Sequence, residues 1–347
     1  MGKMMKPAKS KAPRANAQKT CFLSMNRKGI FFTFIAITLI AVLLLVFTPQ
    51  AGISLQKNTQ AIDTRISVVD NYITDLENRY FETILRASAY KAILSMVYYM
   101  NSTGSYITNF DASFSEIMVT GKINGIPIDS ITGKKIMENN TLEDWSNKII
   151  GVAKDTLNVN TTITIIDVSG FQTKPWNIDS SLLVNYSVQS NVADWKRSAL
   201  ITATISIEGL NDPYYLVNTN KAHTNQIKKS SVEFNEWNIA KAREHLRNGT
   251  YVHWENSDAP SFLMRLTNNM SASSCCGIES LVNPNKITPS DQRESYADYF
   301  FWQHKFANNC TQLYNITGLW DEFRYFKLDF EHVTRYNITS QDAVRNC

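Results

Sequence analysis

The sequence predicts an α+β protein with a transmembrane helix near its N-terminus, and three observations lead to this prediction. Residues 30–48 are a continuous uncharged and mostly apolar stretch. Apolar or small residues then recur in steps of four and three from Ile62 to Tyr80, and steps of seven, three, four and three keep the phase to Val97, which is the spacing of one helix face. Beyond residue 160, apolar and polar residues alternate, as they do in strands of an antiparallel sheet. The expected order is a transmembrane helix, a long amphipathic helix, an antiparallel-sheet head domain and a mixed C-terminal subdomain.

The apolar stretch has the length of a membrane span. Residues 30–48 contain no charge, glycine or proline, and a helix of this length at about 1.5 Å per residue crosses most of a ~30 Å hydrocarbon layer. The 29 residues before it carry eight of the chain's 35 Lys and Arg residues and no acid, and such positive charge marks the cytoplasmic side. We therefore predict a single-pass protein of the cell membrane, with residues 1–29 as a disordered basic cytoplasmic tail and residues 49–347 extracellular. A buried core helix is the alternative for residues 30–48.

A candidate processing junction precedes this stretch and consists of Arg27, Lys28, Gly29 and Ile30. A basic pair, a glycine and an apolar helix in this order resemble the leader junction of type IV prepilins and of archaeal class III signal peptides. The resemblance implies cleavage after Gly29, with the apolar helix retained on a pilin-like surface subunit. Phe34 departs from the family pattern, since bacterial pilins usually carry glutamate there. An uncleaved anchor and a signal peptide cleaved near Ala51 are the alternatives, and Met25 is a second candidate start.

The next segment, residues 49–100, is predicted to be a stalk. No proline or glycine occurs between Gly52 and Gly104, and the apolar positions from Ile62 to Tyr80 alternate in steps of four and three, as in a helix that packs along a narrow seam. One long amphipathic helix is therefore expected over 54–100. Through residues 30–100 the chain is expected to associate with the lipid bilayer, with other copies or with other pilin-like subunits. The alternative for the part beyond Tyr80 is packing on the protein's own head domain.

Residues 101–220 are predicted to form the α+β head domain. Thr141 and Asp144 have the spacing of a capping box, which predicts a helix from there to about Leu157. Three candidate strands follow: 161–168 is rich in β-branched residues, and 182–188 and 195–207 alternate apolar and polar residues. This pattern predicts an antiparallel sheet with one packed face, covered by the preceding helices.

Residues 221–347 are predicted to form a less regular, aromatic-rich subdomain. Thirteen aromatic residues lie between Tyr296 and Tyr336. Such rings can form a binding surface for a surface glycan or a protein, for which Trp302, Trp320 and Tyr325 are the candidates. The alternative is an aromatic core.

Four cysteines and nine glycosylation sequons follow the apolar stretch. An even cysteine set outside a membrane predicts two disulfides with three connectivities. Because a bridge between the neighbours Cys275 and Cys276 is strained, each is expected to pair with Cys310 or Cys347. Zinc is the rival interpretation, but no paired CxxC supports it, and no metal is predicted. The sequons permit glycosylation at Asn101, Asn139, Asn160, Asn185, Asn248, Asn269, Asn309, Asn315 and Asn337.

The sequence offers little sign of catalysis. Nucleophile-elbow, zinc-protease, phosphate-loop and dinucleotide motifs are absent, so no enzyme activity and no cofactor are predicted. Residues beyond 48 carry 27 basic against 31 acidic side chains, which argues against a nucleic-acid partner. The expected function is a membrane-anchored extracellular structural or adhesion protein, pilin-like or pilus-associated. The alternatives are a receptor or adhesin that binds glycan or protein through the aromatic region, and an extracytoplasmic hydrolase.

Overall fold

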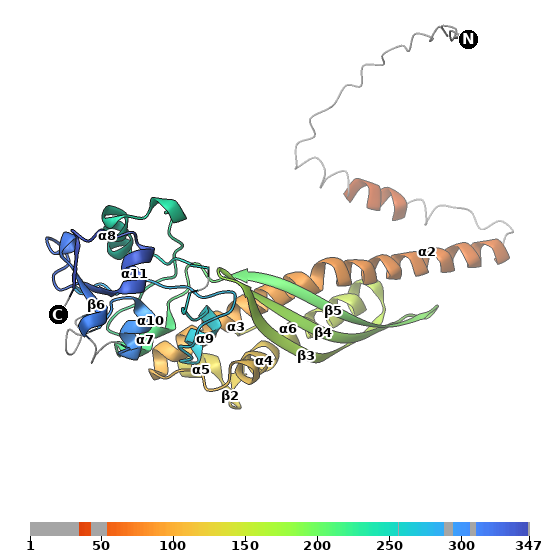
Figure 1. The fold of residues 1–347 in the computed structure, drawn as a ribbon. Coiled ribbons are helices and arrows are strands. Elements are labelled where there is room, and N and C mark those ends of the chain that lie inside the picture. Colours follow the sequence, from red (N-terminus) through yellow and green to blue (C-terminus); the bar gives the residue numbers. More distant parts are fainter. Residues whose placement is uncertain (1–34, 43–53, 256, 288–293, 306–309, 346–347) are drawn as a thin grey trace, which may run out of the picture. The chain divides into compact units, whose positions relative to one another are not determined.

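The computed structural model describes residues 35–42, 54–255, 257–287, 294–305 and 310–345 (Figure 1). The chain divides into two compact units, Met1–Ala61 and Ile62–Cys347. The larger unit contains the α+β fold.

The N-terminal unit corrects the predicted membrane topology. Its described part includes a helix at 35–42, whose eight residues rise about 12 Å, well short of a ~30 Å hydrocarbon layer. Among the residues that the structure describes, no helix combines the length and the apolar character needed to cross a bilayer. The structure therefore contradicts three linked predictions: the transmembrane helix over 30–48, the single-pass membrane protein, and the location at the cell membrane inferred from them. The candidate junction from Arg27 to Ile30 lies outside the described residues.

One continuous helical run forms the spine of the fold. It consists of α2 (Ser54–Asp75), a π-helical turn η1 (Leu76–Tyr80) and α3 (Phe81–Thr103). The run ends at Gly104, which takes a left-handed conformation with φ of 71° and donates its N–H to the Met100 carbonyl, as a C-terminal glycine commonly does. The long helix predicted over 54–100 is thus present, with a π turn inside it.

The π turn changes which residues of this helix are buried. Val69, Ile73 and Leu76 are buried as the three-four spacing predicts. A π turn holds one more residue than an α turn, so the buried row continues at Phe81 instead of Tyr80, and Tyr80 is 54% exposed. The predicted seam is therefore wrong at Tyr80, whereas Val97, its last predicted position, is buried.

Four shorter helical segments follow the spine: α4 (Phe110–Thr120), α5 (Ile128–Thr132), α6 (Leu142–Val152) and a second π turn, η2 (Ala153–Leu157). A two-residue pair of strands, β1 (Lys122–Ile123) and β2 (Ile126–Pro127), lies between α4 and α5. The capping box predicted at the start of α6 is confirmed. Asp144 N donates to Thr141 Oγ1 over 3.0 Å, and Thr141 N donates to Asp144 Oδ2 over 3.2 Å.

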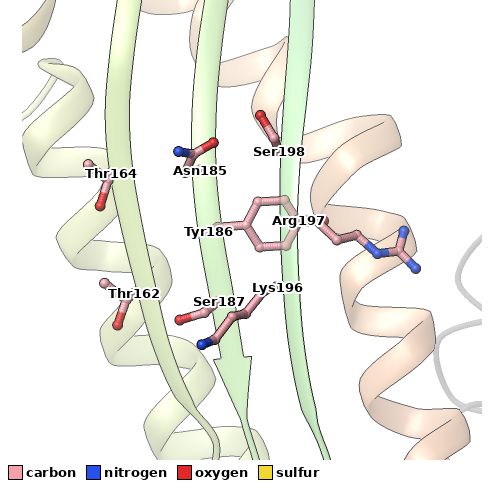
Figure 2. Close-up of a pocket in the computed structure, with 8 residues that line it drawn as sticks. All are labelled: Thr162, Thr164, Asn185, Tyr186, Ser187, Lys196, Arg197 and Ser198. Atoms are coloured by element: carbon pink, nitrogen blue, oxygen red, sulfur yellow. The ribbon is translucent and has the colours of Figure 1, made fainter.

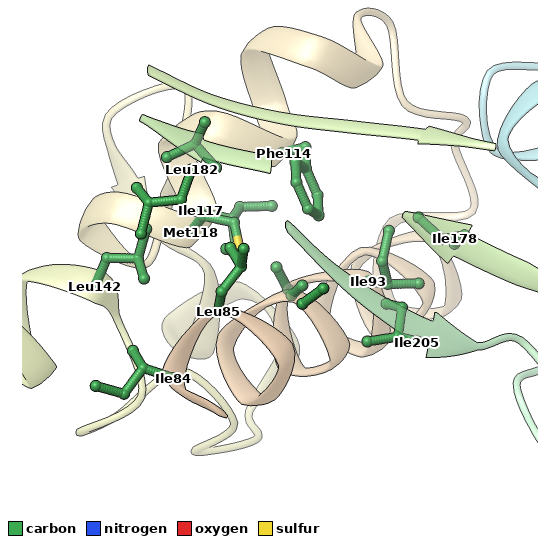
Figure 3. Packing of buried hydrophobic residues seen from close by; sticks show 14 of the residues in the cluster. Ile84, Leu85, Ile93, Phe114, Ile117, Met118, Leu142, Ile178, Leu182 and Ile205 are labelled. Carbon is green, nitrogen blue, oxygen red and sulfur yellow. The ribbon is translucent and has the colours of Figure 1, made fainter. Parts of the chain in front are cut away.

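Three long antiparallel strands form the main sheet in the order β3–β4–β5. They are β3 (Asn160–Lys174), β4 (Asn177–Gln189) and β5 (Asp194–Ser206). Alternate residues of β4 are buried. Among the helices that cover this face of the sheet, α3 contacts β4 and β5, and α4 and α6 contact β3. Figure 3 shows Leu182 of the sheet beside Met118 and Leu85 of the helices. The predicted antiparallel sheet with helices on one face is confirmed.

The chain beyond the sheet, residues 207–345, consists of short elements and is called the C-terminal region here. Its helices are α7 (Pro213–Asn218), η3 (Phe234–Glu236), α8 (Ile239–Asn248), α9 (Phe262–Leu266), α10 (Asp298–Gln303), η4 (Cys310–Gln312), η5 (Thr317–Leu319) and α11 (Phe330–Arg335). A three-stranded antiparallel sheet has the order β7 (Lys327–Asp329), β6 (Leu313–Ile316) and β8 (Ala343–Arg345). Aromatic rings pack together between these elements, with Trp237 4.9 Å and Trp254 5.6 Å from the ring centre of Tyr336. The region therefore contains an aromatic core.

Candidate functional site: an apolar groove beside the long helix

An apolar groove of about 570 Å³ lies between the spine helix and the α6–η2 segment. The spine lines one wall with Tyr72, Leu76, Tyr80, Thr83, Ile84 and Ala87. The opposite wall consists of Trp145, Lys148, Ile149, Val152, Ala153, Thr156 and Leu157. We call this feature the apolar groove. Because its lining is almost entirely apolar, it is suited to hold an apolar segment.

Both walls of the apolar groove contain a π turn. Leu76 and Tyr80 belong to η1, and Ala153 and Leu157 belong to η2. Turns of this kind are rare and occur often at functional sites. In the spine wall the extra residue of η1 leaves Tyr80 at the rim, where the regular spacing would bury it. Val152, which directly precedes η2, is 60% exposed.

Arg65 fixes one end of the apolar groove. Its guanidinium donates to the carbonyl oxygen of Leu157, and to that of Asn158 over 3.1 Å. The carbonyls at the end of a helix lack hydrogen-bond donors inside the helix, and the Arg65 guanidinium provides a donor for both. The contact therefore ties the end of η2 to α2.

The groove contains few polar groups. Trp145 Nε1 is buried and has no hydrogen-bond partner among the described residues. Lys148 Nζ lies 4.3 Å from the centre of the Trp145 ring and donates to the Asn139 carbonyl over 3.1 Å. Burial raises the pKa of the Tyr72 hydroxyl, which stays neutral near pH 7. With no acid-base pair in the lining, the geometry is suited to binding by burial and not to proton transfer.

The outer face of the main sheet is a shallow polar surface. Figure 2 shows the residues on three adjacent strands, of which six face outward: Thr162, Thr164, Asn185, Ser187, Lys196 and Ser198. Tyr186 and Arg197, which alternate with them, point to the opposite face, toward the spine helix. The Tyr186 hydroxyl donates to Glu77 of η1, and Arg197 Nη1 lies 3.1 Å from Glu77 Oε2. Burial, followed by the carboxylate of Glu77, raises the pKa of Tyr186. These contacts hold the sheet on the spine helix, and they leave short hydroxyl and amide groups at the surface.

The three aromatic residues predicted to bind a ligand have different environments. Trp302 is half-buried, with its ring centre 5.8 Å from that of Tyr215 and 4.7 Å from that of Phe301. Trp320 and Tyr325 are exposed. Trp302 therefore belongs to the aromatic core.

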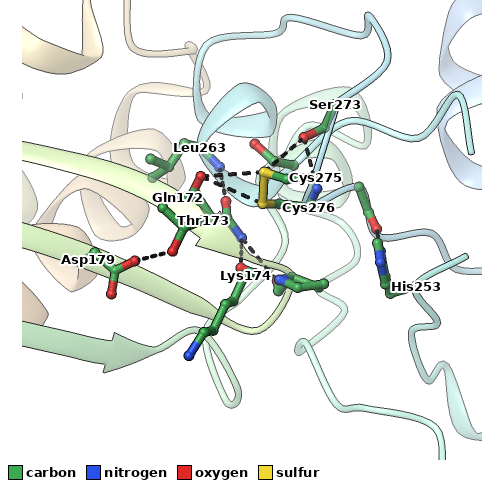
Figure 4. Close-up of a disulfide and its surroundings, with 12 residues drawn as sticks. Gln172, Thr173, Lys174, Asp179, His253, Leu263, Ser273, Cys275 and Cys276 are labelled. Atoms are coloured by element: carbon green, nitrogen blue, oxygen red, sulfur yellow. Dashed lines mark hydrogen bonds between the residues drawn. A yellow bond between two sulfur atoms is a disulfide. The ribbon is translucent and has the colours of Figure 1, made fainter. Parts of the chain in front are cut away.

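The observed disulfide differs from the expected pairing. Cys275 and Cys276 are bonded to each other, with their Cα atoms 3.7 Å apart (Figure 4). The reason lies in the loop that holds them, since Ser273 N donates to the Ala259 carbonyl and Ile278 N donates to the Pro260 carbonyl. Anchored on both sides, the loop keeps the two sulfurs close together. The predicted pairing with more distant cysteines is wrong; the Cys310 side chain and Cys347 lie outside the described part of the chain.

The sequon asparagines within the described residues are exposed or half-buried: Asn101, Asn139, Asn160, Asn185, Asn248, Asn269, Asn315 and Asn337. Asn309 lies outside the described residues. Among the side chains that the structure places, no group of three His, Cys, Asp or Glu residues is arranged to hold a metal ion.

A buried charge cluster in the C-terminal region was not predicted. Arg265 is fully buried, and its Nη1 lies 2.7 Å from Asp212 Oδ2 and 2.8 Å from Asp298 Oδ2. Its Nη2 donates to the carbonyl of Ile278. Burial raises the pKa of Asp298, and the arginine opposes that shift. The ion pairs join three short segments of the chain.

A second buried cluster surrounds His332. Its Nδ1 lies 2.7 Å from Asp329 Oδ2, and its Nε2 lies 3.3 Å from Glu279 Oε2. Burial alone would lower the pKa of His332, but the carboxylates of Glu279 and Asp329 raise it to about 10. The histidine is therefore a buried cation between two carboxylates. All three side chains are enclosed by protein, which indicates a structural role.

Comparisons with protein-family models, curated proteins and solved structures find no match for the chain.

Proposed function

We propose that this chain is a pilin-like structural subunit that assembles with other copies, and that the apolar groove of one copy receives the apolar N-terminal helix of the next. The observation that carries the proposal is the groove itself, an exposed apolar channel between two helices that each contain a π turn. Grooves of this form bind helices that present an apolar face.

The proposed occupant is the helix at 35–42 of a second copy. Its large apolar side chains are exposed: Ile35, Ile37, Leu39, Ile40 and Val42. No charged residue occurs in the surrounding stretch 30–48, so an approaching helix would bring no unpaired charge into the groove. Exposed apolar surface of this extent favours burial against a partner.

The groove offers matching surface at its rims. Tyr80 and Val152 project from opposite walls and are both more than half exposed. An inserted helix would cover these two side chains together with the floor residues between them. The association gains about 25 cal/mol for each Å² of apolar surface removed from water, less the cost of immobilising the partner.

A cross-linking experiment between two distinguishable copies tests the proposal. One copy carries Leu39→Cys and the other, with a different affinity tag, carries Val152→Cys, both in a background in which Cys21, Cys310 and Cys347 are replaced by Ser. A short bismaleimide should then produce the mixed dimer. Each copy has only one of the two introduced thiols, so a link formed within a single molecule cannot account for the product.

The matched control places the cysteine at Leu200, which is 68% exposed on β5. Equal yields of mixed dimer with Val152→Cys and with Leu200→Cys would contradict the proposal. As a second readout, Val152→Glu should lower self-association in sedimentation velocity by about tenfold or more, because a buried charge would replace a buried valine. Its far-UV circular dichroism should remain that of the parent, since the side chain is exposed in the single copy.

A further inference from the structure

A second concave site lies in the C-terminal region, at the end of the β3–β4 hairpin. We infer that this site binds the ring of a pyranose sugar. We call it the aromatic cleft; it has a volume of about 210 Å³ and is lined chiefly by Trp176, Lys229, Ser230, Phe234, His253 and Trp254. None of these residues lines the apolar groove, so the inference does not depend on the proposed assembly.

The cleft presents to solvent an aromatic ring that is not part of the buried core. Phe234 is 74% exposed, yet it is held in place, since its ring centre lies 5.7 Å from that of the buried Trp254 in an edge-to-face arrangement. Trp237 lies behind, 5.6 Å from Trp254. A rigid aromatic surface over a packed aromatic floor suits a flat ligand with an apolar face, and the C–H face of a pyranose is such a surface.

Polar groups of both kinds surround this surface. His253 Nδ1 lies 2.6 Å from the Gly277 carbonyl, and because a carbonyl only accepts, Nδ1 must be the donor. In the neutral ring Nε2 is then an acceptor. Lys229 Nζ, 5.9 Å from the centre of the Trp176 ring, supplies donors. Ser230 Oγ accepts from Val232 N over 3.2 Å and retains its own proton to donate. Sugar hydroxyls, which both donate and accept, match this mixture.

The disulfide loop supports two walls of the cleft. Gln172 Nε2 donates to the carbonyls of Lys174 and Pro175 over 3.1 and 3.0 Å, and this fixes the turn that carries Trp176. The two sulfurs of the disulfide lie 3.5 and 3.6 Å from the Gln172 carbonyl oxygen (Figure 4).

The other side of the same loop holds His253 through Gly277. A Cβ atom at Gly277 would lie 2.1 Å from the Ala259 carbonyl oxygen, so only glycine permits this close backbone approach. The walls carrying Trp176 and His253 are therefore positioned by one anchored loop before any ligand arrives, which reduces the cost of binding.

A proline-rich peptide is the other ligand that aromatic clefts commonly take. Prolines lack a backbone N–H, so such a peptide would offer carbonyl acceptors and leave the acceptor at His253 Nε2 unmatched. In addition, Trp254 Nε1 already donates to Glu279 Oε1 over 2.8 Å and is not available to a peptide carbonyl. The arrangement therefore favours the sugar.

The full-length chain should be titrated with cellohexaose, chitohexaose, mannohexaose and a polyproline decapeptide, with intrinsic tryptophan fluorescence and calorimetry as readouts. We expect saturable binding of at least one hexasaccharide. Phe234→Ala should raise its Kd about tenfold, and Phe234→Tyr, which keeps the ring, should leave it within about twofold. The matched control is Phe330→Ala, which removes a phenylalanine that is 65% exposed elsewhere on the C-terminal region.

Three outcomes would overturn the inference. They are the absence of binding to all three sugars, equal effects of Phe234→Ala and Phe330→Ala, and binding of the decapeptide alone. Loss of sugar binding in a chain that still self-associates would leave the proposed assembly untouched, so the two proposals fail separately.

Discussion

The core beneath the main sheet and the core of the C-terminal region are held together in different ways. Under the sheet, apolar side chains such as Leu85, Phe114 and Leu182 pack between long helices and long strands. In the C-terminal region, charged side chains are as deeply buried as the aromatic rings, and Arg265 and His332 have no exposed surface.

The difference follows from the length of the elements. A helix leaves its first four N–H groups and last four carbonyls without internal partners, so α10, with six residues, satisfies few of its own backbone groups. Buried side chains supply the hydrogen-bond partners that these backbone groups lack within the helix. Asp298 Oδ1 accepts from Tyr299 N over 2.7 Å, and Asp298 Oδ2 accepts from Ser280 N over 3.1 Å. Short elements thus depend on specific polar contacts, whereas long elements depend on apolar burial.

The largest expected effect comes from removing the buried arginine. Arg265→Met should lower the free energy of unfolding by about 3–5 kcal/mol, because the carboxylates of Asp212 and Asp298 would remain buried without their cation. Urea unfolding, followed by near-UV circular dichroism, measures the change. The matched control is Arg86→Met, which removes an arginine that pairs with Glu82 at the surface of α3 and should have little effect. Comparable losses in the two variants would show that the buried pairs do not hold the C-terminal region.

Two buried histidines should make stability depend on pH in opposite directions. Burial lowers the pKa of His245 to about 4, below its unfolded value of about 6.5. The unfolded chain therefore binds the proton more readily, and this contribution is present above pH 6.5 and is lost as the pH falls toward 4. The pKa of His332 is raised to about 10, so its contribution is present below pH 6.5 and is lost as the pH rises toward 10.

Each histidine changes the free energy of unfolding by at most about 1.4 kcal/mol per pH unit. Urea titrations at pH 5, 7 and 9 should show the decline on the alkaline side disappear in His332→Gln and the decline on the acid side disappear in His245→Gln. If both variants keep the pH profile of the parent, the two side chains do not titrate as their surroundings indicate.

Local signals explain which parts of the fold could be predicted. The helix over 54–100, the capping box at Thr141 and the strands of the main sheet follow from spacing within a few residues, and each is present. The same reasoning placed Tyr80 in the buried seam, because the three-four spacing contains no sign of a π turn. Composition alone suggested a membrane span, and the helix described in that stretch, at 35–42, is shorter.

The candidate sites depend on contacts between residues distant in the sequence, and most of them could not be predicted from it. Arg265 pairs with residues 53 positions before it and 33 after it, and no pattern in the sequence links them. The apolar groove arises where faces of two separate helices fail to meet, although the helix that supplies its second wall was predicted. The aromatic cleft joins a hairpin turn to a loop more than 50 residues later in the chain. Its rings lie outside the aromatic-rich stretch from Tyr296 to Tyr336, for which a binding surface was predicted.

The smallest expected effect compares one tryptophan from each core. Trp254 Nε1 donates to Glu279 Oε1 over 2.8 Å, whereas Trp145 Nε1 has no partner among the described residues. Trp254→Phe should lower the free energy of unfolding by about 1–3 kcal/mol, since a buried carboxylate loses a donor. In Trp145→Phe, removal of the unsatisfied donor should stabilise the fold and loss of buried ring area should destabilise it. The two contributions oppose each other, so the net change in the free energy of unfolding should be under about 1 kcal/mol. Urea unfolding of both variants at pH 7 measures the difference. A larger loss for Trp145→Phe would mean that ring packing outweighs hydrogen bonding in both regions, and the contrast between the two cores would then be one of composition and not of energy.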